Sequence, residues 1–432
     1  MVDGQLELGV SKAIGLFDSL SDQPLDAMLT LLQRLRSDPR SGKIDLGIGV
    51  YGDKTGATPI MRAVKMAEAR LVETQQSKAY LAPEGDEGFL KAMAPVILGG
   101  DLAASSEITG LQTPGGTGAL RLAAALIHKA NPEARIWLGL PTWPNHASLM
   151  EAAGLVVLEH PFFDTRSQSI CFDEMMARLE ASARAGDCLL LHACCHNPTG
   201  ADFSDEQWQA VGELLVRKGM IPLIDAAYQG LGQGLEEDAK AMRDLVKRVP
   251  EALIACSNSK NFGLYRDRIG SVWVKAHSVQ ASRRARANMI LLARSMWSMP
   301  PDHGASIVRT ILESEDLKRV WTGELAGMRE RIQTMRRRLA ETVPELDAVS
   351  RQSGLFSLLP LNREVIIDLR ETYGIYMLES GRINISGLTE ENLPTLAKSL
   401  SPESLHQYFH PASDGTPHPT MRLKEGEDHV TC

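Results

Sequence analysis

The chain has 432 residues, 44% of them hydrophobic and 23% charged, so it can bury one large core or two moderate ones. The formal net charge of −8 is small for this length, and the lack of any run of about five like charges argues against a nucleic-acid partner. The start of the chain lacks a secretory signal pattern, and no run of about eighteen apolar residues could cross a membrane. We therefore expect a globular, cytoplasmic protein with no nucleic-acid or membrane partner.

The six cysteines are too sparse in so long a chain for a disulfide scaffold. No two of them form a Cys-x-x-Cys metal or redox pair, so most are expected to be small buried hydrophobic residues. They are Cys171, Cys188, Cys194, Cys195, Cys256 and Cys432.

In the middle of the chain, short apolar runs alternate with helix-length amphipathic segments, a rhythm typical of a mostly parallel β-sheet covered by helices. The candidate strands are residues 108–113, 135–140, 156–161, 188–193, 221–225, 253–257 and 271–274. Helices are expected at 119–130, 146–153, 173–184 and 205–218, and the last begins with a capping box formed by Ser204 and Gln207. The pattern predicts an α/β domain.

After residue 274 the pattern changes to long charged helices, at 278–296 and 317–339, followed by short strands near 354–359 and 382–386. This change predicts a second, smaller α+β domain, completed by about the first fifty residues. The expected parts are an N-terminal arm (1–16), the small domain in two parts (17–55 and 321–409), the large domain (56–320) and a C-terminal tail (410–432).

Polar or aromatic residues follow five of the strands at their carboxyl ends, where open α/β sheets bind their ligands. We therefore expect these residues to converge on one crevice. In chain order they are Gly115 to Gly118, Trp143 and His146, Asn197, Asp225 and Tyr228, and Lys260.

The first of these segments, Gly115-Gly116-Thr117-Gly118, opens an alanine-rich helix, where backbone N–H groups and the helix dipole can hold a phosphate. The same pattern also fits a plain strand-to-helix connection. It lacks the ending of a nucleotide P-loop and the spacing of a dinucleotide fingerprint. It indicates a phosphate site only in combination with other residues.

Lys260 and Asp225 add chemistry to this crevice. Lys260 lies among small residues with Arg266 and Arg268 nearby, and a lysine in a cationic, partly desolvated site can attack a carbonyl as the free amine. Asp225 ends an apolar strand, where its carboxylate needs a cationic partner, and a protonated pyridine nitrogen meets that need. Taken singly, the two residues also fit a solvated surface lysine and a turn aspartate.

In combination, these segments resemble the class I aspartate and aromatic amino acid aminotransferases from about Leu46 to Leu388. The matching motifs occupy residues 113–120, 141–146, 194–200, 225–230 and 257–265, with Arg268 just beyond the last. The resemblance implies fold-type I, with a mostly parallel seven-stranded sheet in a large domain and a smaller α+β domain. It also implies pyridoxal 5'-phosphate as the cofactor.

The resemblance implies a role for each matching residue. Lys260 would be the Schiff-base lysine and the general acid and base, and Asp225 would pair with the pyridine nitrogen, supported by His146. The other residues around the cofactor would be Tyr228 and Asn197 at the phenolic oxygen, Trp143 on the ring, Gly116, Thr117, Ser257 and Arg268 at the phosphate, and Tyr80 from a second subunit. Those around the substrate would be Arg382 on the α-carboxylate, Gly49 at the entry, and Trp143, Asn197 and Arg294 on the walls.

The implied activity is transamination between an L-amino acid and a 2-oxo acid such as 2-oxoglutarate, with ping-pong kinetics, in a homodimer with shared sites. Arg294 matches the arginine that grips the distal carboxylate of aspartate or glutamate, but aromatic members carry it too. Near it, Trp297, Met299 and Ala79 stand where aspartate-preferring members commonly have Tyr, Asn and Asn. This departure favours aromatic or broad-range substrates, and aspartate aminotransferase is the alternative.

Two other classes of protein are compatible with parts of the pattern. A cofactor-binding regulatory protein without catalysis is disfavoured because Lys260, Asp225, Arg268 and Arg382 are all present. A nicotinamide oxidoreductase would share the α/β rhythm, but the chain lacks a dinucleotide fingerprint.

Overall fold

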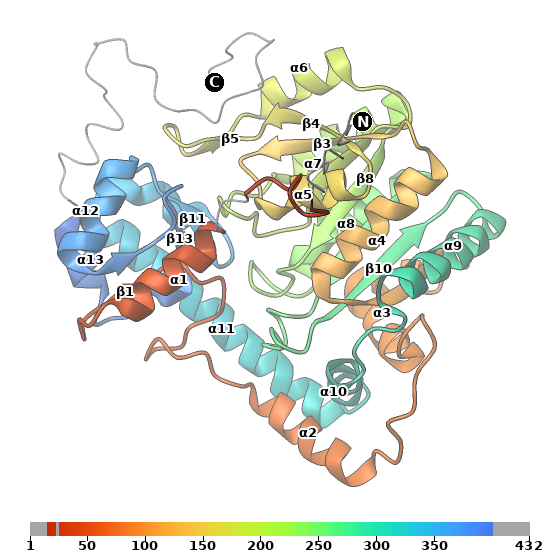
Figure 1. Cartoon of the computed structure of the whole chain (residues 1–432), viewed down its shortest axis with the longest axis horizontal. Coiled ribbons are helices and arrows are strands. Elements are labelled where there is room, and N and C mark those ends of the chain that lie inside the picture. Colours follow the sequence, from red (N-terminus) through yellow and green to blue (C-terminus); the bar gives the residue numbers. More distant parts are fainter. Residues whose placement is uncertain (1–14, 23–25, 401–432) are drawn as a thin grey trace, which may run out of the picture.

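A seven-stranded β-sheet organises the computed structural model, which describes residues 15–22 and 26–400 (Figure 1). The strands, in spatial order, are β2 (Ile108–Pro114), β10 (Ile269–Lys275), β9 (Ala252–Ser257), β8 (Ile221–Ala226), β7 (Cys188–His192), β3 (Arg135–Leu140) and β4 (Val156–Pro161). Only β10 runs antiparallel to its neighbours within this sheet. The mostly parallel sheet predicted from the sequence is confirmed, whereas the predicted tail at 410–432 lies outside the described residues.

The sheet separates two hydrophobic cores, because successive side chains of a strand point to opposite faces. In β8, Leu223 packs in one core and its neighbour Ile224 in the other. One core is closed by α4 (Gly115–Ala130), α5 (Asn145–Ala152) and α9 (Val279–Trp297). The other is closed by α3 (Glu87–Ala103), α6 (Phe172–Ser182), α7 (Asp205–Lys218), α8 (Glu237–Arg248), α10 (His303–Leu312) and the helices that follow.

The helix predicted at 119–130 begins earlier, at Gly115, so the glycine-rich segment forms its first turn. Gly115 has φ +71°, a conformation that glycine adopts without steric cost. The other predicted helices agree within a few residues, and the predicted capping box of Ser204 and Gln207 is present at the start of α7. Helices α2 (Arg62–Thr74), α3, α8 and α10 were not predicted from the sequence.

The long helix α11 (Glu315–Thr342) runs from the region of α2 and α10 to the smaller group of elements (Figure 1). That group contains α1 (Ala27–Ser37), β1 (Ile44–Asp45), η1 (Pro344–Arg351), β11 (Phe356–Leu358), α12 (Arg363–Tyr373), β12 (Ile375–Tyr376), β13 (Arg382–Asn384), η2 (Ile385–Gly387) and α13 (Leu393–Ser399). The early strand β1 pairs in parallel with β12, and β11 pairs with β13 in antiparallel fashion. A further hairpin joins β5 (Phe163–Asp164) and β6 (Ser169–Ile170).

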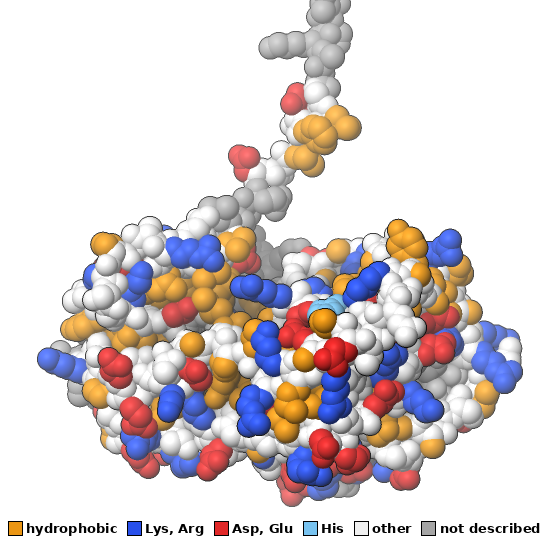
Figure 2. All heavy atoms as spheres, turned by 90° about the horizontal axis from the view of Figure 1, so that it is seen from below, with side chains coloured by type: hydrophobic (Ala, Val, Ile, Leu, Met, Phe, Trp, Pro, Cys, Tyr) orange, Lys and Arg blue, Asp and Glu red, His pale blue; other side chains and the backbone are white. Residues whose placement is uncertain are grey.

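Acidic and basic side chains are interspersed over the face of the molecule seen in Figure 2. None of the helices in the described residues is long and apolar enough to cross a membrane.

Candidate active site

Asp225, at the carboxyl end of β8, is held by a buried histidine from the first turn of α5. The Oδ2 of Asp225 lies 3.1 Å from the Nε2 of His146, and the Nδ1 of His146 lies 2.8 Å from the hydroxyl of Thr142. Burial acts to raise the pKa of Asp225, yet the hydrogen bond and attraction of His146, with the charge of Lys260, lower it overall. The aspartate is therefore a buried anion with its free oxygen available to a cationic partner.

Lys260 follows β9 and is only partly buried, with its Nζ 4.9 Å from the centre of the Tyr228 ring. Loss of water around the amine lowers the pKa of Lys260, and Arg268 adds to this effect while Asp225 opposes it. A lysine in this environment reaches its neutral, nucleophilic form more readily than an exposed one.

The first turn of α4 lies directly against the Lys260 segment. A Cβ added to Gly115 would be 2.6 Å from the Nη2 of Arg268, and one added to Gly116 would be 2.9 Å from the Cβ of Ser257. Arg268 adopts a left-handed backbone with φ 56°, and its Nη1 donates to the carbonyl of Tyr265 at 3.0 Å. Backbone N–H groups at a helix start, a hydroxyl and a guanidinium thus lie close together, a combination that suits a phosphate.

Tyr228 and Asn197 meet on the other side of Lys260, where the Nδ2 of Asn197 donates to the Tyr228 hydroxyl at 3.3 Å. Burial raises the pKa of Tyr228, so its hydroxyl keeps its proton at neutral pH. The Nη1 of Arg382, on β13, reaches the Oδ1 of Asn197 at 3.4 Å.

The guanidinium of Arg382 lies against Phe356, with its carbon 4.4 Å from the ring centre. Its Nη2 donates to the carbonyl of Gly47 at 3.0 Å, while its buried Nε has no partner among the described residues. A Cβ on Gly49 would lie 3.1 Å from the Phe356 ring, so glycine keeps this wall open. A buried guanidinium with an unused N–H is suited to a carboxylate ligand.

The structure brings together Lys260, Asp225, His146, Tyr228, Asn197, Arg382 and Gly49, and places Gly116, Ser257 and Arg268 beside them. Trp143 and Thr117 are partly buried, and the Trp143 ring meets the His146 ring edge-on at 5.2 Å. Two predicted residues stand apart. Tyr80 is 94% exposed and Arg294 is exposed in the last turn of α9, and neither makes a hydrogen bond or ion pair with a described residue.

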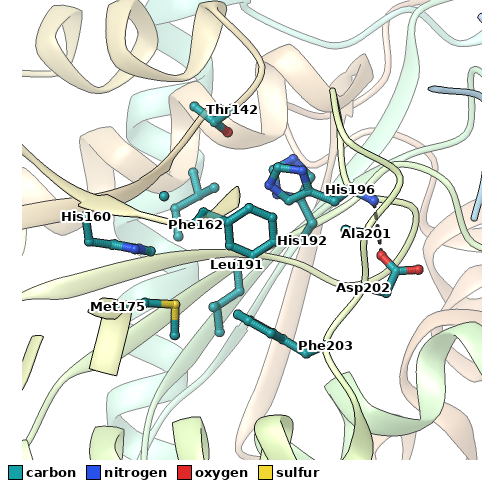
Figure 3. A pocket seen from close by; sticks show the side chains of 12 residues that line it. Thr142, His160, Phe162, Met175, Leu191, His192, His196, Ala201, Asp202 and Phe203 are labelled. Atoms are coloured by element: carbon teal, nitrogen blue, oxygen red, sulfur yellow. Dashed lines mark hydrogen bonds between the residues drawn. The ribbon is translucent and has the colours of Figure 1, made fainter. Parts of the chain in front are cut away.

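Figure 3 shows a pocket that is lined in part by His160, His192 and His196 and was not predicted from the sequence. Its residue Thr142 forms the hydrogen bond with His146 described above. His192 lies between the rings of His146 and His196, at centroid distances of 5.3 and 4.1 Å. Burial lowers the pKa of His160 to about 4 and that of His192 to about 3, so both rings are neutral at neutral pH. His196 belongs to the motif at 194–200 and could have been noticed in the sequence. His160 comes from a different strand, β4, and no nearby sequence pattern connects it with His196.

The sequence profile of the family described as "Aminotransferase class I and II" matches residues 41–400. The chain belongs to this family. It is 52% identical to the tyrosine aminotransferase of Rhizobium meliloti over 86% of this chain and 96% of that protein. It is also 42% identical to the aspartate aminotransferase of Salmonella typhi, over 89% and 99% of the two chains.

Solved structures agree with this assignment. An aromatic amino acid aminotransferase with 3-indolebutyric acid has a TM-score of 0.85 and 44% identity, covering 89% of this chain and 98% of that one. An aromatic-amino-acid aminotransferase from Burkholderia pseudomallei, covalently bound to pyridoxal phosphate, has a TM-score of 0.87 and 33% identity, covering 92% and 100%. This chain is therefore an enzyme that transfers amino groups, and the predicted fold class and family are confirmed.

Proposed function

We propose that this aminotransferase uses pyridoxal 5'-phosphate, with Lys260 as its covalent anchor and as the group that moves the substrate proton. The observation that carries the proposal is the partly desolvated amine of Lys260 between the Tyr228 ring and the charges of Asp225 and Arg268. The surrounding groups fit the cofactor: a cradle at Gly115 and Gly116 for the phosphate and a buried anion for the ring nitrogen.

When bound, the cofactor supplies a protonated ring that stores the electron pair left when a substrate Cα loses its proton. Asp225, fixed by His146, keeps that ring nitrogen protonated. Lys260, as the neutral amine, accepts the proton from the substrate Cα and later returns it to the reacting carbon. Tyr228 and Asn197 would hold the oxygen on the ring by hydrogen bonds, and Trp143 would contact the ring.

Arg382 is proposed to hold the α-carboxylate of the amino acid and of the 2-oxo acid. Its Nε has no partner among the described residues, and a guanidinium can offer a carboxylate two N–H donors side by side. Asn197 and Phe356 fix its orientation from two sides.

We propose aromatic or broad-range amino acids as substrates, with 2-oxoglutarate as an amino acceptor. Trp297, Met299 and Ala79 supply fewer hydrogen bonds around Arg294 than the Tyr and Asn residues common in aspartate-preferring members. The relatives include both tyrosine and aspartate aminotransferases, so aspartate aminotransferase is the second candidate.

The active unit is proposed to be a homodimer in which Tyr80 and Arg294 complete the site of the partner. The support is that both side chains are exposed and unpaired in the described part of the single chain. A cytosolic location stays a prediction from the sequence.

Borohydride reduction of the enzyme followed by peptide mapping tests the role of Lys260. We expect the cofactor label on Lys260 alone in the native protein. The Lys260→Ala variant should bind the cofactor without a covalent label, whereas Lys91→Ala, at an exposed lysine, should behave like the native enzyme. A label on another lysine would overturn the mechanism.

A further inference from the structure

Arg336, on α11, is a buried cation that pairs with no carboxylate in the described part of the chain. Its side chain is 1% exposed. Its N–H groups donate to the carbonyls of Val349 (3.2 Å), Ser353 (2.9 Å), Gly354 (2.8 Å) and Phe356 (2.6 Å), and to the hydroxyl of Ser357 (2.7 Å).

All of these acceptors belong to one short segment, residues 349–357, which connects η1 to β11. A guanidinium presents its donors in a rigid planar fork, so it fixes the relative positions of the carbonyls that it binds. Burial lowers the pKa of Arg336 to about 10, so the group still carries its charge at neutral pH. A single side chain therefore ties together the two ends of the 349–357 segment.

This segment packs against the loop that carries Asn197. The N–H of Ser353 donates to the carbonyl of Gly200 at 2.7 Å. A Cβ on Gly200, which has φ +71°, would lie 2.5 Å from the Phe356 carbonyl and 3.1 Å from the Nη2 of Arg336. Glycine is required for this close approach, so a shift of either segment would move the other.

The two segments meet again at Arg382. The Nη1 of Arg382 lies 3.4 Å from the Oδ1 of Asn197, and its guanidinium carbon lies 4.4 Å from the centre of the Phe356 ring. With the carbonyl of Gly47, these contacts orient Arg382, and the segments that supply Asn197 and Phe356 both adjoin Arg336.

We propose that Arg336 is a positioning residue for the binding of substrate carboxylates, acting through Asn197 and Phe356 on Arg382. This inference rests on the proposed role of Arg382 in the active site. Arg336 itself touches neither substrate nor cofactor. Since Lys260, Asp225 and His146 are held by other contacts, a change at Arg336 should weaken carboxylate binding much more than it weakens binding of the cofactor.

The test compares Arg336→Lys with Arg337→Lys in the holoenzyme. Arg337 is the exposed neighbour on the same helix, so its exchange controls for a general effect on α11. Lysine keeps the charge at Arg336 but cannot bind several carbonyls in one plane. We expect KM for the amino acid and for the 2-oxo acid to rise at least tenfold in Arg336→Lys, with kcat per bound cofactor changed less. Calorimetric titration with glutarate, which has carboxylates but no amine, should show the same loss of binding.

The affinity for the cofactor should stay close to the native value in both variants, and the absorption spectrum of the bound cofactor should be unchanged in Arg337→Lys. A KM within twofold of the native value in Arg336→Lys, accompanied only by a lower Tm, would show a merely structural role. If that variant does not fold, Ser357→Ala removes one acceptor of Arg336, and Ser350→Ala, whose hydroxyl donates to the carbonyl of Asp347, is its control. An unchanged KM in Ser357→Ala would then reject the inference.

Arg382→Lys, measured in parallel, separates this inference from the proposed function. If Arg382→Lys binds carboxylates as well as the native enzyme, the assignment of Arg382 is wrong. If only Arg382→Lys loses binding and Arg336→Lys does not, the assignment of Arg382 stands and the role of Arg336 is wrong.

Discussion

The Nε2 of His146 lies 3.1 Å from the Oδ2 of Asp225, and the two residues are 0% and 7% exposed. Because the Nε2 faces a carboxylate, it carries a proton and donates it in the hydrogen bond. The Nδ1 then faces the hydroxyl of Thr142 at 2.8 Å. This chain of contacts keeps Asp225 both ionised and fixed in direction, which is what an electron-withdrawing ring requires from its partner.

Asp225→Asn should slow removal of the substrate α-proton by about 100-fold or more, the scale of losing a preorganised electrostatic partner. Binding of the cofactor should change much less, because the phosphate cradle is untouched. Single-turnover absorbance changes measure the first effect, and cofactor titration the second. Thr142→Val, which removes only the distal hydroxyl, should have a smaller effect. Unchanged single-turnover rates in Asp225→Asn would mean that the carboxylate is only structural.

Lys260→Met should stabilise the protein without cofactor at pH 7, because burial of the charged amine is unfavourable. The pKa of Lys260 in the folded protein is lowered from its ordinary value of 10.5. At pH values between the folded pKa and 10.5, the unfolded chain therefore keeps Lys260 protonated while the folded protein releases that proton. The native protein therefore gains stability as pH rises through that window, and the advantage of the variant should shrink toward pH 10.5. Urea unfolding at several pH values measures this difference. A pH-independent difference, or one equal to that of Lys91→Met, would contradict it.

Arg294→Ala should reduce kcat/KM for aspartate and glutamate by about 2 kcal/mol or more, the scale of losing a charged partner, and affect aromatic substrates little. Arg284→Ala, at an exposed arginine on the same helix, should leave both activities unchanged. Met299→Asn should shift the preference toward aspartate. If the native enzyme prefers aspartate to every aromatic amino acid by about a hundredfold or more, the inference from Trp297 and Met299 is wrong.

Mixing Tyr80→Phe and Lys260→Ala subunits should give hybrid dimers with one fully native site, and the mixture should exceed the activity of the two parents. Random pairing makes about half of the dimers hybrids, so about a quarter of native activity is expected from their native sites. Mixing Lys260→Ala with Asp225→Asn is the control, since both residues serve the site of their own chain and no native site can form. A full-length monomer with native activity would exclude the shared site.

The strands and the residues at their carboxyl ends were predictable, because apolar runs and sharp turns are local features of the sequence. Asp225 and Lys260 were found in this way. The contacts of Phe356 with Arg382 could not be found, since they depend on the pairing of β11 with β13 and not on any nearby pattern. Arg336 was hidden for a related reason: in the sequence it is one of three consecutive arginines in an amphipathic helix, and only its burial distinguishes it.

The pairing of β1 with β12 also bears on how the chain is made. Ile44 donates its N–H to the carbonyl of Gly374, and the carbonyl of Gly47 accepts from Arg382, 335 positions later. During synthesis, the segment around Ile44 leaves the ribosome long before its partner strand exists, whereas the central sheet can assemble from neighbouring units. The site around Arg382 is therefore among the last parts of the molecule to form, and a nascent chain should be able to shape the phosphate cradle before it can bind a substrate carboxylate.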